Sequence, residues 1–172
     1  ARDAMTIDSG AVLVCEPALW RSFPVEDPGG FYWAYNERIL ATAGTNFDLL
    51  LFGSKRLYKI VNHGSTQPKR VRLGDIPSVS TRGHCYFDRY VFFVGFDGCY
   101  ITDGNTVQKI SFEMDPLWFG TEEPQTTRYV EQQIQKGAYP FHVNRNALSG
   151  VFCINDKERH QVMVSLPAND SP

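Results

Sequence analysis

The feature that most constrains the fold is a hairpin pattern in the middle of the chain, at residues 90–104 (YVFFVGFDGCYITDG). An uninterrupted apolar run is followed by Asp-Gly, then by a short second apolar run and another Asp-Gly. Glycine after aspartate permits the positive φ angles of tight hairpin turns, and aromatic and β-branched residues favour strands. The pattern therefore predicts two antiparallel strands joined by a short turn.

The same pattern occurs earlier in the chain, at residues 49–60 (LLLFGSKRLYKI), and a weaker copy occurs at residues 150–165. The first two copies align without a gap, so that the glycines and the tyrosines of the return strands coincide. Equivalent inner-strand positions are Val12, Leu50, Phe92 and Phe152. The first two intervals between them are about 40 residues, which is the period of four-stranded propeller blades, and the last is about 20 residues longer.

Two all-β architectures fit this pattern. One is a β-propeller segment of about three to four blades, and the other is a two-sheet β-sandwich of about ten strands. The repeat favours the propeller, because the strands of a sandwich have no reason to repeat in sequence. The composition agrees with either, since 12 Phe and 8 Tyr favour strands, and 14 Gly and 10 Pro suit many short turns. We expect residues 1–172 to be a single β domain or a propeller fragment, as the start of the chain (Ala1-Arg-Asp-Ala4) looks trimmed or processed.

Residues 113–147 differ from the rest of the chain and account for the long last interval. Three prolines punctuate this stretch, and Thr127–Lys136 is its only plausible helix, capped by Thr126 or Thr127. We expect a loop-and-helix excursion from the repeat there.

The cysteines and the net charge set further limits. Cys15, Cys85, Cys99 and Cys153 form no CxxC pair and lie in apolar segments, which predicts buried free thiols. A disulfide between Cys85 and Cys99 is the alternative, if these two lie on adjacent strands. The net charge of −2 indicates neither a nucleic-acid nor an anionic-membrane partner, and no apolar run approaches the roughly 18 residues of a membrane span.

No catalytic or metal-binding motif stands out. The histidines, the adjacent carboxylates and the turn acceptors each have an ordinary structural interpretation: hydrogen-bonded or surface histidines, a solvated acidic loop, and turn chemistry rather than calcium binding. These residues are His63, His84, His142, His160, Glu122, Glu123, Asp97, Asp103 and Asn105. The sequence thus predicts no enzyme, no cofactor, no metal site and no small-molecule substrate.

The charge distribution is more informative than the net charge. Six basic residues fall between Leu49 and Gly74 with no acidic residue among them: Lys55, Arg56, Lys59, Lys69, Arg70 and Arg72. They are either ordinary solvated strand faces or a basic stripe that contacts phosphates or an acidic neighbouring subunit. Acidic residues gather instead in residues 113–131, and this separation suits head-to-tail contacts in a ring of copies.

Four groups of residues carry a resemblance to a known family. They are Ala18–Pro24 (ALWRSFP), the hairpin at 46–58, and the hairpin at 91–111, with the segment DKERHQVMVSLP at 156–167 as a closing hairpin. Together they resemble the propeller of the tail-tube (nozzle) proteins of short-tailed bacteriophages, over about residues 18–111 and 148–167. The chain is shorter than such proteins usually are.

The resemblance implies a structural role in the virion and no catalysis. Subunits of this kind form a ring at the end of the tail that retains packaged DNA and conducts it at infection. The expected partners are further copies of the chain and other virion proteins, with transient contact to DNA. The expected location is the phage tail, after assembly in the host cytoplasm.

Two other functions remain open. The chain is alternatively a β-propeller protein–protein binding module of a cellular complex, which docks a peptide or a subunit on its top face. A hydrolase with a pocket at the strand ends is the third alternative, and it requires convergent polar side chains that the sequence does not show.

Overall fold

Two four-stranded antiparallel sheets form the centre of the molecule. The computed structural model describes residues 11–14, 31–34, 37–45, 48–62, 69–119 and 143–168. In each sheet, strands that follow one another in sequence pair with one another. The first sheet contains β3 (Ile39–Gly44), β4 (Leu49–Gly53), β5 (Leu57–Val61) and β6 (Lys69–Gly74). The second sheet contains β7 (His84–Phe87), β8 (Tyr90–Gly95), β9 (Gly98–Thr102) and β10 (Val107–Lys109).

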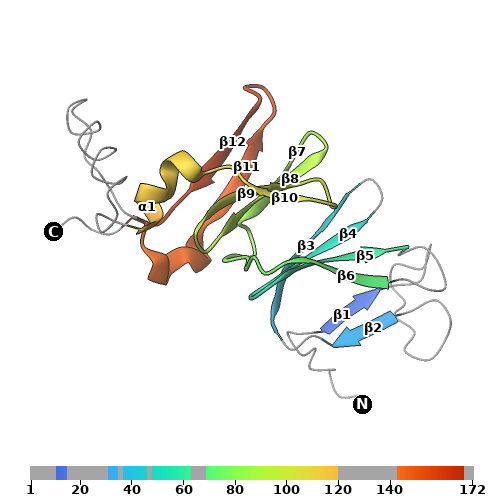
Figure 1. Cartoon of the computed structure of the whole chain (residues 1–172). Helices are drawn as coiled ribbons and strands as arrows, with labels where there is room; N and C mark the ends of the chain where they lie inside the picture. The colour runs from blue at the N-terminus through green and yellow to red at the C-terminus, as the bar shows by residue number, and fades with distance from the viewer. Residues whose placement is uncertain are drawn as a thin grey trace, which may run out of the picture.

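A two-stranded antiparallel hairpin lies at each end of this pair of sheets. One is β1 (Ala11–Val14) with β2 (Phe31–Ala34), and the other is β11 (Phe152–Asp156) with β12 (Gln161–Ser165). Figure 1 shows the two hairpins at opposite ends of the molecule, with the first and second sheets between them. The remaining described elements are η1 (Phe112–Met114), α1 (Asp115–Phe119) and η3 (Arg145–Gly150).

The internal repeat is confirmed in the order of the strands. Leu50 lies on the second strand of the first sheet and Phe92 on the second strand of the second sheet. Tyr58 and Tyr100 both lie on the third strand, and both donate a hydrogen bond to a carboxylate. Each four-stranded sheet is thus built from one copy of the sequence pattern.

The aligned glycines, Gly53 and Gly95, end the second strand of each sheet because no side chain fits there. A Cβ atom on Gly53 would collide with Glu37 Oε2 and lie 2.7 Å from the carbonyl oxygen of Arg56. A Cβ atom on Gly95 would lie 2.8 Å from the ring of Tyr100. In both copies of the repeat, therefore, the glycine at the end of the second strand lies close to the tyrosine–carboxylate pair, where a larger residue would not fit.

The core between the two sheets is aromatic at its centre. The Phe93 ring lies 5.2 Å from that of Phe52 in an edge-to-face contact and 5.4 Å from that of Tyr100 in a stacked one. Leu50, Leu57 and Val91 complete this cluster and are fully or almost fully buried. Such aromatic pairs add about 0.5–1.5 kcal/mol to the stabilisation that comes from burial of their area.

The second sheet is also covered on its other face. There Phe92, Val94 and Cys99 pack with Leu117 and Trp118 of α1, together with partly buried residues of β11–β12. Because β8 has neighbours on both faces, every residue from Val91 to Gly95 is buried, which explains its uninterrupted apolar run.

The predicted all-β class is confirmed. The described residues form no closed ring of blades, and the stacked sheets fit an arc of a propeller and a β-sandwich equally well. Within the expected excursion at 113–147, the described residues contain short helices and the isolated bridge of Val143 with Ala168. The helix expected at 127–136 lies outside the described residues, so the excursion stays a prediction.

The expected free thiols are confirmed at three of the four cysteines, and the alternative disulfide is wrong. Cys85, Cys99 and Cys153 are free, but the expected burial is complete only at Cys99, since Cys85 and Cys153 are partly buried. Cys85 lies on β7 and Cys99 on β9, and β8 runs between these two strands, so the two residues are not on adjacent strands. Cys15 lies outside the described residues.

Replacement of Phe93 by Ala tests the importance of the aromatic contact between the sheets. We expect Phe93→Ala to lower the free energy of unfolding by about 3–5 kcal/mol, because it removes a fully buried ring and leaves a cavity between the sheets. The matched control is Phe112→Ala, since Phe112 is 64% exposed, and its effect should stay within about 0.5 kcal/mol. Chemical denaturation of both variants measures the difference. Equal effects would contradict a core centred on Phe93.

Candidate assembly surface

The six basic residues of the sequence prediction do not form one continuous surface. Cross-strand pairing puts Arg70 opposite Ile60 and Arg72 opposite Tyr58, whereas Lys69 lies opposite Val61. Because side chains alternate between the faces of a sheet, Arg70 and Arg72 share one face of the first sheet, and Lys59 and Lys69 belong to the other. Lys55 and Arg56 lie in the turn before β5.

Three of these cations form ion pairs with two acidic residues just outside the basic segment. Arg56 Nε lies 3.2 Å from Asp75 Oδ1, and Arg72 pairs with the other oxygen of the same carboxylate. Lys59 Nζ lies 3.3 Å from Asp48 Oδ2. Exposed ion pairs such as those of Asp75 contribute little to stability, but they lower the local positive charge.

Lys59 joins the two sheets. Its side chain is only 13% exposed, and Nζ donates to Asn105 Oδ1 at 2.8 Å as well as to Asp48. Asn105 belongs to the turn between β9 and β10 of the second sheet. Lys59 therefore acts in packing, and the exposed basic residues of the first sheet gather on β6, at Lys69, Arg70 and Arg72. The guanidinium carbon of Arg70 lies 6.0 Å from the centre of the Tyr58 ring.

The turn acceptors have the structural roles that the sequence favours. Asp103 Oδ1 accepts from the backbone N–H groups of Asn105 and Thr106, both at 2.8 Å, and these bonds lower the pKa of its carboxyl group. Asp97 instead accepts from the Tyr100 hydroxyl at 2.7 Å. Burial, the largest cause, and this bond raise the pKa of Tyr100.

One cluster of charged groups lies beside this tyrosine. Lys109 Nζ lies 2.7 Å from Asp115 Oδ1 and 3.7 Å from Asp97 Oδ2, and the lysine side chain is only 12% exposed. The lysine thus pairs with two carboxylates, and the group links β10, α1 and the turn before β9. This arrangement is that of a structural ion-pair network.

The histidines are dispersed over the described residues. The His84 ring stacks on Phe52 with centroids 5.1 Å apart, and burial lowers the pKa of its imidazole. His160 lies in the turn between β11 and β12 with a φ of 51°. Within the described ranges no three His, Cys, Asp or Glu side chains lie together as metal ligands would. His63, His142, Glu122 and Glu123 lie outside these ranges.

An uncovered apolar face lies on the β11–β12 hairpin, and the sequence prediction missed it. Phe152, Ile154 and Met163 are 39%, 48% and 45% exposed, and the pairing of Ile154 with Met163 puts these two residues directly opposite each other. The other face, with Cys153, Val162 and Val164, packs on the second sheet. Exposed and partly buried residues alternate along both strands, which identifies the uncovered face in the structure. The sequence does not identify it, because both faces contain apolar residues.

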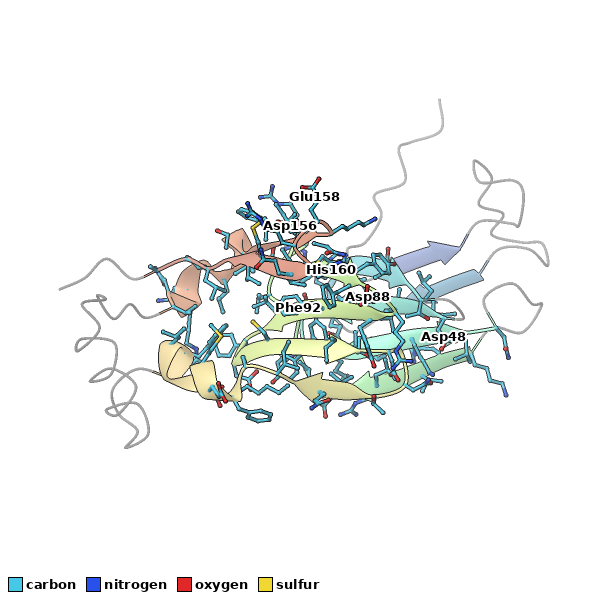
Figure 2. All side chains as sticks on the ribbon, turned by 90° about the horizontal axis from the view of Figure 1, so that it is seen from above. Asp48, Asp88, Phe92, Asp156, Glu158 and His160 are labelled. Carbon is cyan, nitrogen blue, oxygen red and sulfur yellow. The ribbon has the colours of Figure 1, made fainter. Side chains whose placement is uncertain are left out.

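A groove of about 630 Å³ runs between the β11–β12 hairpin and the second sheet. Its walls come from β8, β9, the segment after β10, and β12 with the residues that follow it. Figure 2 shows Phe92 between the hairpin and the second sheet. The lining residues are Phe92, Cys99, Ile110, Ser111, Met114, Val162, Val164, Ser165 and Leu166.

A smaller cavity of about 390 Å³ lies at the turns of the same region. Asp88 and His160, both labelled in Figure 2, contribute to it from the β7–β8 and β11–β12 turns. The strands that lead into these turns are joined directly, because Asn155 Nδ2 of β11 donates to the carbonyl oxygen of Tyr86 of β7 at 2.5 Å. This cavity is therefore a crevice between two packed turns.

Comparison with known proteins assigns no family. A scan against protein-family models finds no match, and a search of curated proteins finds none either. The resemblance to phage tail-tube proteins stays a prediction. Among the described residues there is also no helix of sufficient length and apolar character to span a bilayer.

The buried thiols give a prediction about pH. Burial raises the pKa of Cys99 to about 11 and that of Cys153 to about 12, so both remain protonated well above the usual range of a thiol. We expect iodoacetamide to label the folded protein slowly at pH 8, with a rate that rises about tenfold per pH unit towards pH 11. Mass spectrometry of the labelled peptides measures each rate.

The unfolded protein in denaturant is the control for this labelling, and its thiols should react rapidly at pH 8. Because the pKa values are raised in the folded state, folding holds protons that the unfolded chain releases above about pH 8.5. The stability that they contribute is present below that pH and is lost as the pH rises towards 11. Fast labelling of folded Cys99 at pH 8 would contradict its burial.

Proposed function

We propose that this chain is a non-enzymatic structural subunit of a bacteriophage tail, which assembles into a ring that retains and conducts DNA. The proposal joins the resemblance to tail-tube proteins of short-tailed phages with the architecture of the described residues. It treats the chain as a building block whose surfaces contact further copies and other virion proteins.

The single observation that carries the proposal is the stack of sheets with an uncovered apolar end. Each four-stranded sheet packs its apolar face on the next layer, and the last layer, β11–β12, exposes Phe152, Ile154 and Met163. Exposed apolar side chains that adjoin one another on a sheet face are typical of surfaces that bind protein. A subunit whose surface is covered by neighbouring copies in an assembly has a surface of this kind.

The chemistry of the described polar groups supports a structural role. The partly buried group of Lys109 with Asp97 and Asp115 holds elements of the second sheet together through ion pairs. Burial raises the pKa of Cys99 and of the partly buried Cys153, so both thiols stay protonated near neutral pH and are poor nucleophiles. A pocket with two or more carboxylates of perturbed pKa would instead favour the hydrolase alternative.

The oligomeric state of the native protein tests this function. We expect a defined ring of six or twelve copies when the mass is measured by native mass spectrometry and the symmetry by electron microscopy. Closed rings follow when the contact between copies is heterologous and its rotation closes. A stable monomer that binds one cellular partner would overturn the proposal and favour the binding module.

The exposed arginines of β6 provide a separate prediction about assembly. We expect Arg70→Glu combined with Arg72→Glu to break assembly and leave the subunit folded, because both side chains are exposed and lie on the same side of the edge strand β6. Lys55→Glu is the matched control for a charge reversal, since Lys55 is exposed in a turn. Sedimentation measures assembly and circular dichroism measures folding. Unaltered assembly of the double variant would show that this face makes no contact.

A further inference from the structure

The exposed edges of the four sheets differ in how they are protected against pairing with another strand. The outer strand β6 carries Lys69, Arg70 and Arg72, and β10 has only three residues, one of them a lysine. The outer strand β3 has a register shift between Ile39 and Ala41. Charges, short length and bulges are the devices by which proteins block edge pairing.

The strand β12 has none of these devices. Its sequence is Gln-Val-Met-Val-Ser, with no charge and no proline, and its pairing with β11 is regular over five residues. On the side away from β11, no strand of the described residues pairs with it. A regular, uncharged and apolar edge of this kind accepts an additional strand by β-augmentation.

The groove of about 630 Å³ lies beside this strand and provides the space for such an addition. Val162 and Val164 of β12 form one wall, and Phe92, Cys99 and Ile110 of the second sheet region form the other. A strand beside β12 would place its inward side chains on this apolar surface. The backbone hydrogen bonds would then come from the edge and the burial of apolar area from the groove.

The number of strands in each described sheet indicates that β11–β12 has room for two further strands. The first and second sheets have four strands each, whereas the third layer, β11–β12, has two. The chain has one other two-stranded sheet in the described residues, β1–β2, and it lies at the opposite end of the molecule (Figure 1). The first and second sheets separate the two hairpins, so a hairpin from another copy is better placed to reach β12 than β1–β2 of the same copy.

The sequence of β1–β2 suits a strand pair inside a stack. Its residues are Ala-Val-Leu-Val and Phe-Tyr-Trp-Ala, with no charge on either strand. The register puts Val12 opposite Trp33 and Leu13 opposite Tyr32, so apolar and aromatic residues occupy both sets of alternate positions. Strands that are buried on both faces have this composition, as β8 does.

We propose that the β1–β2 hairpin of a second copy pairs with the free edge of β12, fills the apolar groove, and completes a four-stranded sheet. The inference deepens the proposed function, on which it rests for the existence of an assembly of copies, and it names the contact between them. The contact joins two different surfaces of the chain, so copies add head to tail, and a ring or a filament results.

A lysine in the groove tests this contact. Ile110 lines the groove and is 49% exposed, so Ile110→Lys leaves the subunit folded but places a charge where the incoming strand must pack. We expect the concentration for half-maximal assembly to rise by at least about tenfold, because an unpaired charge is costly to bury. The matched control is Val71→Lys on the charged strand β6, where Val71 is 38% exposed, and we expect no change there.

Mixing two blocked variants distinguishes this contact from a symmetric one. Leu13→Pro removes a backbone donor from β1, and we expect it to prevent assembly by disturbing the other half of the contact. The Ile110→Lys subunit still has an intact β1–β2 hairpin, and the Leu13→Pro subunit still has an intact groove. Their mixture should form dimers that grow no further, whereas each variant alone stays monomeric. A mixture that remains monomeric would overturn the pairing of β1–β2 with β12.

Hydrogen exchange of the unaltered protein provides a test that needs no variant. The amide groups of residues 161–165 should become more protected as protein concentration rises, because the edge is covered only in the assembly. Protection that is already complete in a monomer would show that this chain, or a further segment of a longer one, covers the edge itself, and would overturn the proposal. Assembly that persists in Ile110→Lys overturns this contact alone, whereas a monomeric unaltered protein overturns the proposed function as well.

Discussion

The contact of Phe93 with Phe52 and Tyr100 is the interaction on which the rest of the structure depends. Each of the two four-stranded sheets has an apolar face that is unstable in water, and these three rings bring the two faces together. The second sheet is then fixed between two layers, so that its other face holds α1 and the β11–β12 hairpin. The surfaces that we assign to assembly are positioned by this chain of packed layers.

The two sheets solve the same local problem with different residues. In both, a buried tyrosine on the third strand needs a partner for its hydroxyl group. In the second sheet the partner is Asp97, three residues before Tyr100 in the same turn. In the first sheet it is Glu37, which precedes β3 and also accepts from the backbone N–H groups of Lys55 and Arg56. Glu37 thereby ties the start of the first sheet to its central turn.

The parts of the fold that depend on local pattern could be predicted from the sequence. The apolar runs, the Asp-Gly turns and the alignment of the two hairpins identify β4, β5, β8 and β9 and their equivalence. The disulfide alternative was wrong because it needed the order of strands in a sheet, and sequence spacing does not say that β8 separates Cys85 from Cys99. Sheet order depends on which edges meet in the folded chain, which is a tertiary property.

The candidate surface was harder to predict for the same reason. The interval from Leu49 to Gly74 contains no acid, yet Asp48 and Asp75 at its two borders form ion pairs with three of its cations. Lys59 is charged but works as a packing residue between the sheets. The apolar face of β11–β12 was equally hidden, because both alternating sets of residues there include apolar side chains and only tertiary packing decides which set is covered.

A stack of sheets needs an end at which apolar packing stops, and each sheet needs edges that do not pair with further strands. The described residues include one edge strand that is charged and one that is not. In repeat architectures each layer buries its neighbour, and the outermost layer requires a polar outer face to remain soluble. The strand β6 has such a composition at its edge, with three cations in six residues. The hairpin β11–β12 has the opposite: an apolar outer face, an uncharged edge and a groove beside it. In the proposed assembly this layer is an interior one, and the uncharged β1–β2 strands of a second copy complete it.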